Sequence, residues 1–224
     1  MKITYLELPT KDLIAQRDYY SQVLELRVNL SADRLEVQAG ETILIFTQAL
    51  PDFDGAYHFA FNIPENQFGA AKAWISARIP LLKDEEGKIE FDSASWNSHS
   101  VYLKDTGGNV LEFIARHNLK NARTFTCDGT QILHISEIGL PSEDVVTFAN
   151  ELCVKLEISI FKQEPNSTFT PVGDDHGLFI VHIKDRIWIP NSGVPAKLLP
   201  VKVMGEADGN KWEVRGVPYE IITR

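Results

Sequence analysis

The sequence predicts an α+β fold made of tandem modules, each with the order strand, helix, strand, strand, strand. A strand pattern followed directly by an amphipathic helix pattern occurs three times, beginning near residues 2, 57 and 132. Short strand patterns separated by turn residues follow each of these helices. Near the end of the chain the strand patterns return without a segment long enough for a helix. We therefore expect three clear modules and a degenerate fourth module without its helix.

The first two modules account for the first half of the chain. The first has a strand, a helix that Thr10 or Asp12 can cap, and three strands, expected at residues 2–8, 9–26, 27–31, 34–39 and 42–48. The second has a strand, a helix with apolar residues on one side, and three further strands, expected at residues 57–63, 64–79, 81–92, 98–105 and 109–117. A tight turn at residues 106–109 joins the last two of these strands.

The second half of the chain holds the third and fourth modules. The third has a strand, a helix that Ser142 can cap, and three strands, expected at residues 132–141, 142–156, 157–163, 169–173 and 177–183. The degenerate fourth has strands only, expected at residues 197–205, 211–215 and 218–224. The repeats predict two domains of paired modules, residues 1–117 and residues 130–224.

Composition narrows the class of protein and its partners. The chain of 224 residues is 44% hydrophobic and carries a net charge of −9, which argues against nucleic acid or an anionic membrane surface as partner. No apolar run approaches the roughly 20 residues that a membrane span needs. Two cysteines are too few for a disulfide framework, and the first twelve residues do not read as a signal peptide. We expect a cytoplasmic monomer or homodimer that handles a small molecule.

One histidine stands out in the strand pattern "YHFAFNI" at residues 57–63. Alternation along a strand puts Tyr57, Phe59, Phe61 and Ile63 on one face. The other face carries His58, Ala60 and Asn62. A strand with so apolar a packing face therefore directs a lone imidazole to the opposite side of the sheet.

Three segments resemble the vicinal oxygen chelate superfamily, which includes glyoxalase I, fosfomycin-resistance thiol transferases, bleomycin-binding proteins and extradiol ring-cleavage dioxygenases. They are "LELPTKDLIAQRDYYSQVLEL", "YHFAFNI" and "VYLKDTGGNVLEFI". The resemblance covers residues 1–117 well, residues 131–184 moderately and the last 40 residues weakly. It implies that modules pair into half-barrel sheets around a cavity that holds a divalent metal.

The resemblance also implies metal ligands. His58 stands where the superfamily's second module places a ligating histidine, and Glu112 stands at the glutamate of the final strand. The superfamily's third ligand falls at Tyr5 if the second module pairs with the first, and at Glu137 if it pairs with the third. Of these two, only Glu137 is a good ligand for a divalent metal. An imidazole with carboxylates suits Fe(II), Mn(II), Ni(II) or Zn(II).

Other polar residues share the faces of these ligands. Tyr102 precedes Glu112 by ten residues, where the thiol transferases and dioxygenases place a tyrosine that faces the cavity, so we expect it to be catalytic. Ser100 alternates onto the same face as Tyr102, and Asn62 shares the face of His58. We expect both to contact substrate.

The residues support two functions, and a third is consistent with the lost helix. The first is a metal-dependent enzyme that stabilises an oxyanion on a small oxygen-bearing substrate, or that uses Fe(II) and O2. The second is a metal-free binding protein of the bleomycin-resistance type, in which Arg78, Arg116 or Lys202 neutralises the inward carboxylates. The third is a scaffold with a closed cavity.

Overall fold

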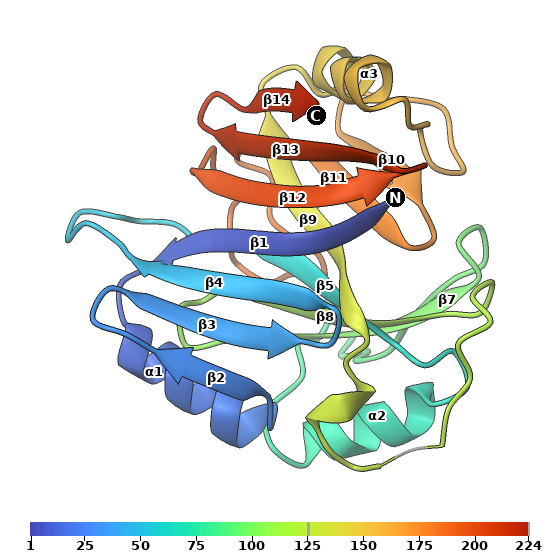
Figure 1. Ribbon diagram of the computed structural model, residues 1–224. Helices are drawn as coiled ribbons and strands as arrows, with labels where there is room; N and C mark the ends of the chain where they lie inside the picture. Colours follow the sequence, from blue (N-terminus) through green and yellow to red (C-terminus); the bar gives the residue numbers. More distant parts are fainter. Residues whose placement is uncertain (125, 224) are drawn as a thin grey trace.

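Two seven-stranded sheets make up most of the computed structural model, which describes residues 1–124 and 126–223. In Figure 1 the first sheet lies in front and the strands of the second cross behind it. One face of each sheet contributes to a shared hydrophobic core, to which Leu6 and Leu8 of the first sheet and Phe59 and Phe61 of the second all belong. The predicted α+β class of strand-rich modules is confirmed.

The first sheet joins the first module to the degenerate fourth. Its strand order is β14-β13-β12-β1-β4-β3-β2, with β1 parallel to β4 and antiparallel to β12. The seven strands are β1 (Lys2–Thr10), β2 (Arg27–Leu30), β3 (Arg34–Ala39), β4 (Thr42–Gln48), β12 (Val201–Ala207), β13 (Asn210–Gly216) and β14 (Glu220–Thr223). The last three form a meander with no helix among them, as expected for the fourth module. Arg224, the end of the predicted last strand, lies outside the described residues.

The second sheet joins the second module to the third. Its order is β10-β11-β9-β5-β8-β7-β6, with β5 parallel to β8 and antiparallel to β9. The strands are β5 (His58–Ile63), β6 (Phe91–Ser93), β7 (Ser98–Lys104), β8 (Val110–Arg116), β9 (His134–Ser142), β10 (Phe169–Asp174) and β11 (Gly177–Ile183). The second module thus pairs with the third, the arrangement for which the sequence names Glu137 and not Tyr5 as the third ligand; the ligand role itself stays a prediction. The domain boundary between residues 117 and 130 stays a prediction, and each sheet draws strands from both sides of it.

The helices lie where the repeats predict them but are shorter. They are α1 (Leu13–Asp18), which continues into the π-helical turn η1 (Tyr19–Val23), α2 (Phe68–Ser76) and α3 (Val145–Leu156); η2 (Gly129–Gln131) is a 3-10 turn. Among the described residues no helix has both the length and the apolarity to cross a membrane.

Side-chain caps define the starts of two of these helices. Asp12 caps α1, as predicted, by accepting hydrogen bonds from the backbone N–H groups of Ile14 and Ala15. Ser142, the predicted cap of α3, is not the cap. Asp144 accepts from the backbone N–H of Thr147 and takes that role, because the helix begins two residues later than predicted.

Two predicted strands are largely absent. Of residues 81–92 only Phe91 and Asp92 fall in a strand, because Asp84 accepts hydrogen bonds from the backbone N–H groups of Glu86 and Lys88 and closes a turn instead. Residues 157–163 make a single bridge, between Ile160 and Val172. Residues 81–92 are rich in charged and turn-forming residues, which compete with a strand ladder.

Candidate metal centre

The second sheet bears a cavity of about 310 Å³ on the face turned away from the main core. Four aromatic side chains form much of its wall: Phe91, Trp96, Phe169 and Trp188. Its polar lining includes His58, Glu112 and Glu137, together with hydroxyl groups from β7. Its volume is at the lower end of the range for ligand pockets, so it suits a small molecule.

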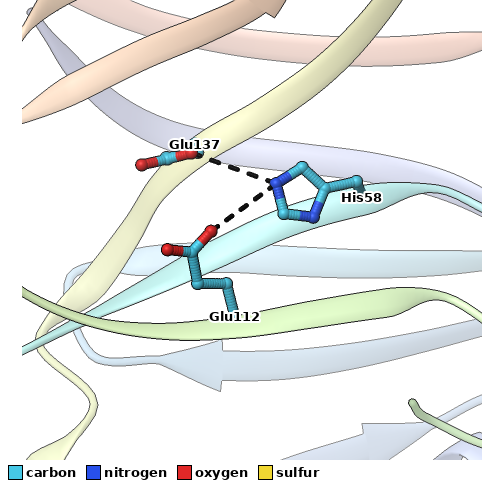
Figure 2. A group of neighbouring side chains, drawn as sticks. All are labelled: His58, Glu112 and Glu137. Carbon is cyan, nitrogen blue, oxygen red and sulfur yellow. Dashed lines mark ion pairs between the residues drawn. The ribbon is translucent and has the colours of Figure 1, made fainter. Parts of the chain in front are cut away.

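His58, Glu112 and Glu137 converge in this cavity from three adjacent strands, β5, β8 and β9. Ala60, which shares a strand face with His58, is paired in register with both glutamates. His58 Nε2 lies 3.7 Å from Oε2 of Glu112 and 4.0 Å from Oε2 of Glu137, and Figure 2 shows both contacts meeting on the same imidazole nitrogen. All three side chains are buried. Within residues 1–124 and 126–223 they are the one group of this kind placed to hold a metal ion.

A backbone hydrogen bond sets the tautomer of His58. Its Nδ1 lies 3.1 Å from the carbonyl oxygen of Val110. Because a carbonyl only accepts, Nδ1 carries the proton and Nε2 directs a lone pair toward the carboxylates. Burial lowers the pKa of His58 to about 4, so the imidazole is neutral near pH 7. A backbone carbonyl that accepts from the other ring nitrogen commonly orients histidines that ligate metals.

Glu112 and Glu137 lie in an environment that disfavours the ionised form of their carboxyl groups. Burial raises the pKa of Glu112, against the opposing effects of the Ser100 hydroxyl, the Arg116 charge and the Tyr102 hydroxyl. Burial also raises the pKa of Glu137, and the charge on Glu112 raises it further. Two carboxylates that face each other cannot both ionise cheaply without a cation between them.

The donor set fits a divalent ion. Three acceptor atoms, one imidazole nitrogen and two carboxylate oxygens, lie within 4.8 Å of one another. Bonds of about 2.1 Å would place neighbouring ligand atoms about 3–3.4 Å apart, so shifts of under about 1 Å would close this group around an ion. A cation there would relieve the repulsion between the carboxylates and satisfy the lone pair of His58.

Arg116 supplies the one protein cation in direct contact with this group among the described residues. Its Nη2 donates to Oε1 of Glu137, while Oε2 of the same carboxylate is the atom nearest His58. The other two candidates named from the sequence lie elsewhere. Arg78 pairs with Glu25, and Lys202 lies over the ring of Tyr5 in the first sheet.

The other predicted site residues are divided between the cavity and the core. Ser100 and Tyr102 line the cavity, and the ring of Tyr102 lies 6.3 Å from that of His58. Burial raises the pKa of Tyr102 well above its ordinary value, so the phenol keeps its proton. Asn62 is fully buried and does not line the cavity. No hydrogen-bond partner for its amide nitrogen or oxygen is found among the described residues.

Sequence reasoning missed His182 and Trp188, which also line the cavity. The ring of Trp188 lies 5.1 Å from that of His58 and 4.7 Å from that of His182. Alternation along β11 places His182 on the same face as Leu178 and Ile180, a signal that was present in the sequence. Trp188 lies in the irregular connection between β11 and β12, where no periodicity points to a site.

Tyr5, the alternative third ligand, belongs to the other sheet. Its hydroxyl donates to Glu7 on the same strand. Burial raises the pKa of Tyr5 to about 12, which disfavours the phenolate that a metal would need. The structure therefore places Tyr5 outside the group formed by His58, Glu112 and Glu137.

Comparisons with known proteins support the fold. No family model and no curated protein matches the sequence. A solved structure described as a putative dioxygenase from Bacillus subtilis is 17% identical with a TM-score of 0.60, and the match covers 82% of this chain and 64% of that protein. The chain thus spans just under two thirds of the length of that protein.

Smaller proteins align with about half of the chain. A lactoylglutathione lyase from Agrobacterium tumefaciens is 20% identical, with a TM-score of 0.40 over 50% of this chain and 90% of its own. A fosfomycin resistance protein from Listeria monocytogenes, solved with Mn(II) and a dihydroxypropylphosphonic acid, is 16% identical, with a TM-score of 0.39 over 50% of this chain and 86% of its own. The likeness to the Bacillus subtilis structure shows that the chain shares the fold of that protein, and its paired modules are those that the resemblance to the vicinal oxygen chelate superfamily implies.

Proposed function

We propose that the protein is a metal-dependent enzyme of the glyoxalase or dioxygenase type that acts on a small oxygen-bearing substrate. His58, Glu112 and Glu137 are the proposed ligands. The observation that supports this most strongly is the convergence of three buried acceptor atoms within 4.8 Å. Acceptors do not gather out of contact with water unless a proton or a cation joins them.

The chemical types of the three ligand atoms indicate which ions the site suits. One imidazole and two carboxylates suit Mn(II) and Fe(II), and also Zn(II) and Ni(II). Such an ion would act as a Lewis acid toward a developing oxyanion, or, as Fe(II), would supply redox chemistry with O2. Arg116 pairs with Glu137, as the metal-free alternative expects, but it binds one oxygen and leaves the other directed toward His58. Among the described residues no lysine or arginine forms an ion pair with Glu112, so the metal-dependent function accounts for more of the site.

The chain's own residues would bind and orient the substrate. The hydroxyl of Tyr102 keeps its proton and can donate a hydrogen bond to a substrate oxygen, with the hydroxyl of Ser100 two residues away on the same face. Trp96, Phe169 and Trp188 exclude water and pack against the apolar part of the substrate. The polarity of the cavity therefore favours a substrate that is apolar at one end and bears oxygen at the other.

The test is the metal content of protein purified without chelator or nickel affinity resin. We expect about one divalent ion per chain in the wild type and a loss in His58→Ala, Glu112→Ala and Glu137→Ala. His134→Ala is the matched control, because His134 is a buried histidine on the same strand as Glu137 but outside the group. If the wild type binds no ion, even after incubation with Mn, Fe, Ni and Zn salts, the proposal is wrong.

A further inference from the structure

Arg116 and Glu137 form a buried ion pair at the edge of the candidate metal site. Arg116 has no exposed surface and Glu137 is 2% exposed. The guanidinium carbon of Arg116 lies 5.3 Å from the ring centroid of Trp96 and 5.7 Å from that of Phe161. A guanidinium is always charged in proteins, so this position holds a permanent positive charge.

Arg116 makes its side-chain hydrogen bond with Glu137. Its Nη2 donates to Oε1 of Glu137, whereas its Nε and Nη1 have no hydrogen-bond partner among the described residues. The one other carboxylate that forms an ion pair with it there, Asp175, lies 4.0 Å from Nη1. Glu112 makes no ion pair with a lysine or arginine in the described part of the chain. The two glutamates of the site therefore differ: Arg116 forms a direct ion pair with Glu137, whereas its charge acts on Glu112 without an ion pair.

This difference changes the charge of a loaded site. Two neutral imidazoles and one carboxylate, a common set for Fe(II), give a net charge of about +1 with a divalent ion. One imidazole and two carboxylates would give zero. Counting Arg116 restores the total to about +1, because its charge cancels that of Glu137.

We infer that Arg116 and Glu137 act together as one neutral ligand, so that the pair replaces an imidazole. The inference rests on the proposed metal site. Arg116 is a positioning residue here: it holds Oε1 of Glu137 and cancels its charge, and Oε2 remains for the ion. A variant with histidine in place of Glu137 and an uncharged side chain in place of Arg116 should therefore still bind the ion.

Two variants test the exchange. In Glu137→His the guanidinium stays buried beside the ion without its carboxylate, and we expect the affinity for Mn(II) and Zn(II) to fall at least tenfold. In Arg116→Leu/Glu137→His the stranded charge is gone, and leucine suits the space between Trp96 and Phe161. We expect affinity within about threefold of wild type. Both affinities are measured by isothermal titration with the metal chlorides, without substrate.

Lys162 supplies the matched control. It also pairs with Asp175 and lies 4.5 Å from the ring centroid of Phe161, but it does not contact Glu137. Adding Lys162→Leu to Glu137→His removes a nearby positive charge and should not restore affinity. If Glu137→His does not fold, Glu137→Gln replaces it in both backgrounds, since glutamine matches glutamate in size and carries no charge.

The outcomes separate this inference from the proposed function. Weak binding in Glu137→His with recovery only in the Arg116→Leu double variant supports it. Equal affinity in the single and double variants overturns it, while the metal site stands if the wild type binds. A wild type that binds neither ion overturns both. A purely structural role for Arg116 would lower the thermal midpoint of the double variant without any recovery of ion affinity.

Discussion

Acid should destabilise the fold through His134, a buried imidazole outside the candidate metal site. Its Nε2 lies 3.1 Å from the carbonyl oxygen of His176 and donates to it. Burial lowers the pKa of His134 from 6.5 to about 4. Between these values the unfolded chain binds more protons than the folded one. The stability from this group is therefore full above pH 6.5 and is lost as the pH falls toward 4.

The size of this loss follows from the two pKa values. Between pH 7.5 and pH 4.5 the free energy of unfolding should fall by about 2–3 kcal/mol through His134 alone. His134→Gln removes the titration while keeping a donor for His176. Urea unfolding of both proteins at the two pH values isolates the effect, because every other titrating group is common to them. If both proteins lose the same stability on acidification, His134 is not buried and neutral as described.

Two further substitutions separate packing from metal binding. Trp188→Ala removes a side chain that is 3% exposed and packs in the aromatic wall, so the free energy of unfolding should fall by about 3–5 kcal/mol, measured by urea denaturation. A loss below about 1 kcal/mol would contradict that packing. Tyr102→Phe should keep about one metal ion per chain, because the phenol retains its proton and is not a proposed ligand. Loss of the ion in this variant would make Tyr102 part of the metal site.

Local patterns in the sequence predict most of the elements. Alternation identifies β5 and β8 almost to their ends, because each strand directs large apolar side chains to one face. The predicted strand at residues 81–92 fails for a local reason, since hydrogen bonds to the Asp84 side chain close a turn in place of the ladder, whereas residues 157–163 keep only a short pairing with β10 around Ile160. The shortened α1 has a different cause: its last turn widens into the π-helical η1, which periodicity alone does not reveal.

No local pattern of residues in the sequence predicts which modules pair. His58 and Glu112 belong to one module, and their convergence follows from the parallel pairing of β5 with β8. Glu137 joins them only because β9 pairs with β5 across the boundary between modules. A register shift between Ala60 and Phe61 adjusts this pairing, and no residue pattern predicts where that shift falls. Arg116 is four residues from Glu112, but its contact with Glu137 depends on the same non-local pairing.

Exposure explains why, among the described residues, the second sheet carries a candidate site and the corresponding positions of the first sheet do not. When the fourth module is aligned with the second, Pro200 falls at the position of His58 and Glu220 at that of Glu112, and Tyr5 of the first module is the alternative to Glu137. Tyr5 is partly exposed and bonded to Glu7, Pro200 offers only a carbonyl that accepts from Tyr57, and Glu220 is exposed and paired with Arg215. Charges in contact with water need no metal to satisfy them. In the second sheet Glu112 and Glu137 are only 4% and 2% exposed, and the burial of two neighbouring carboxylates favours a cation between them.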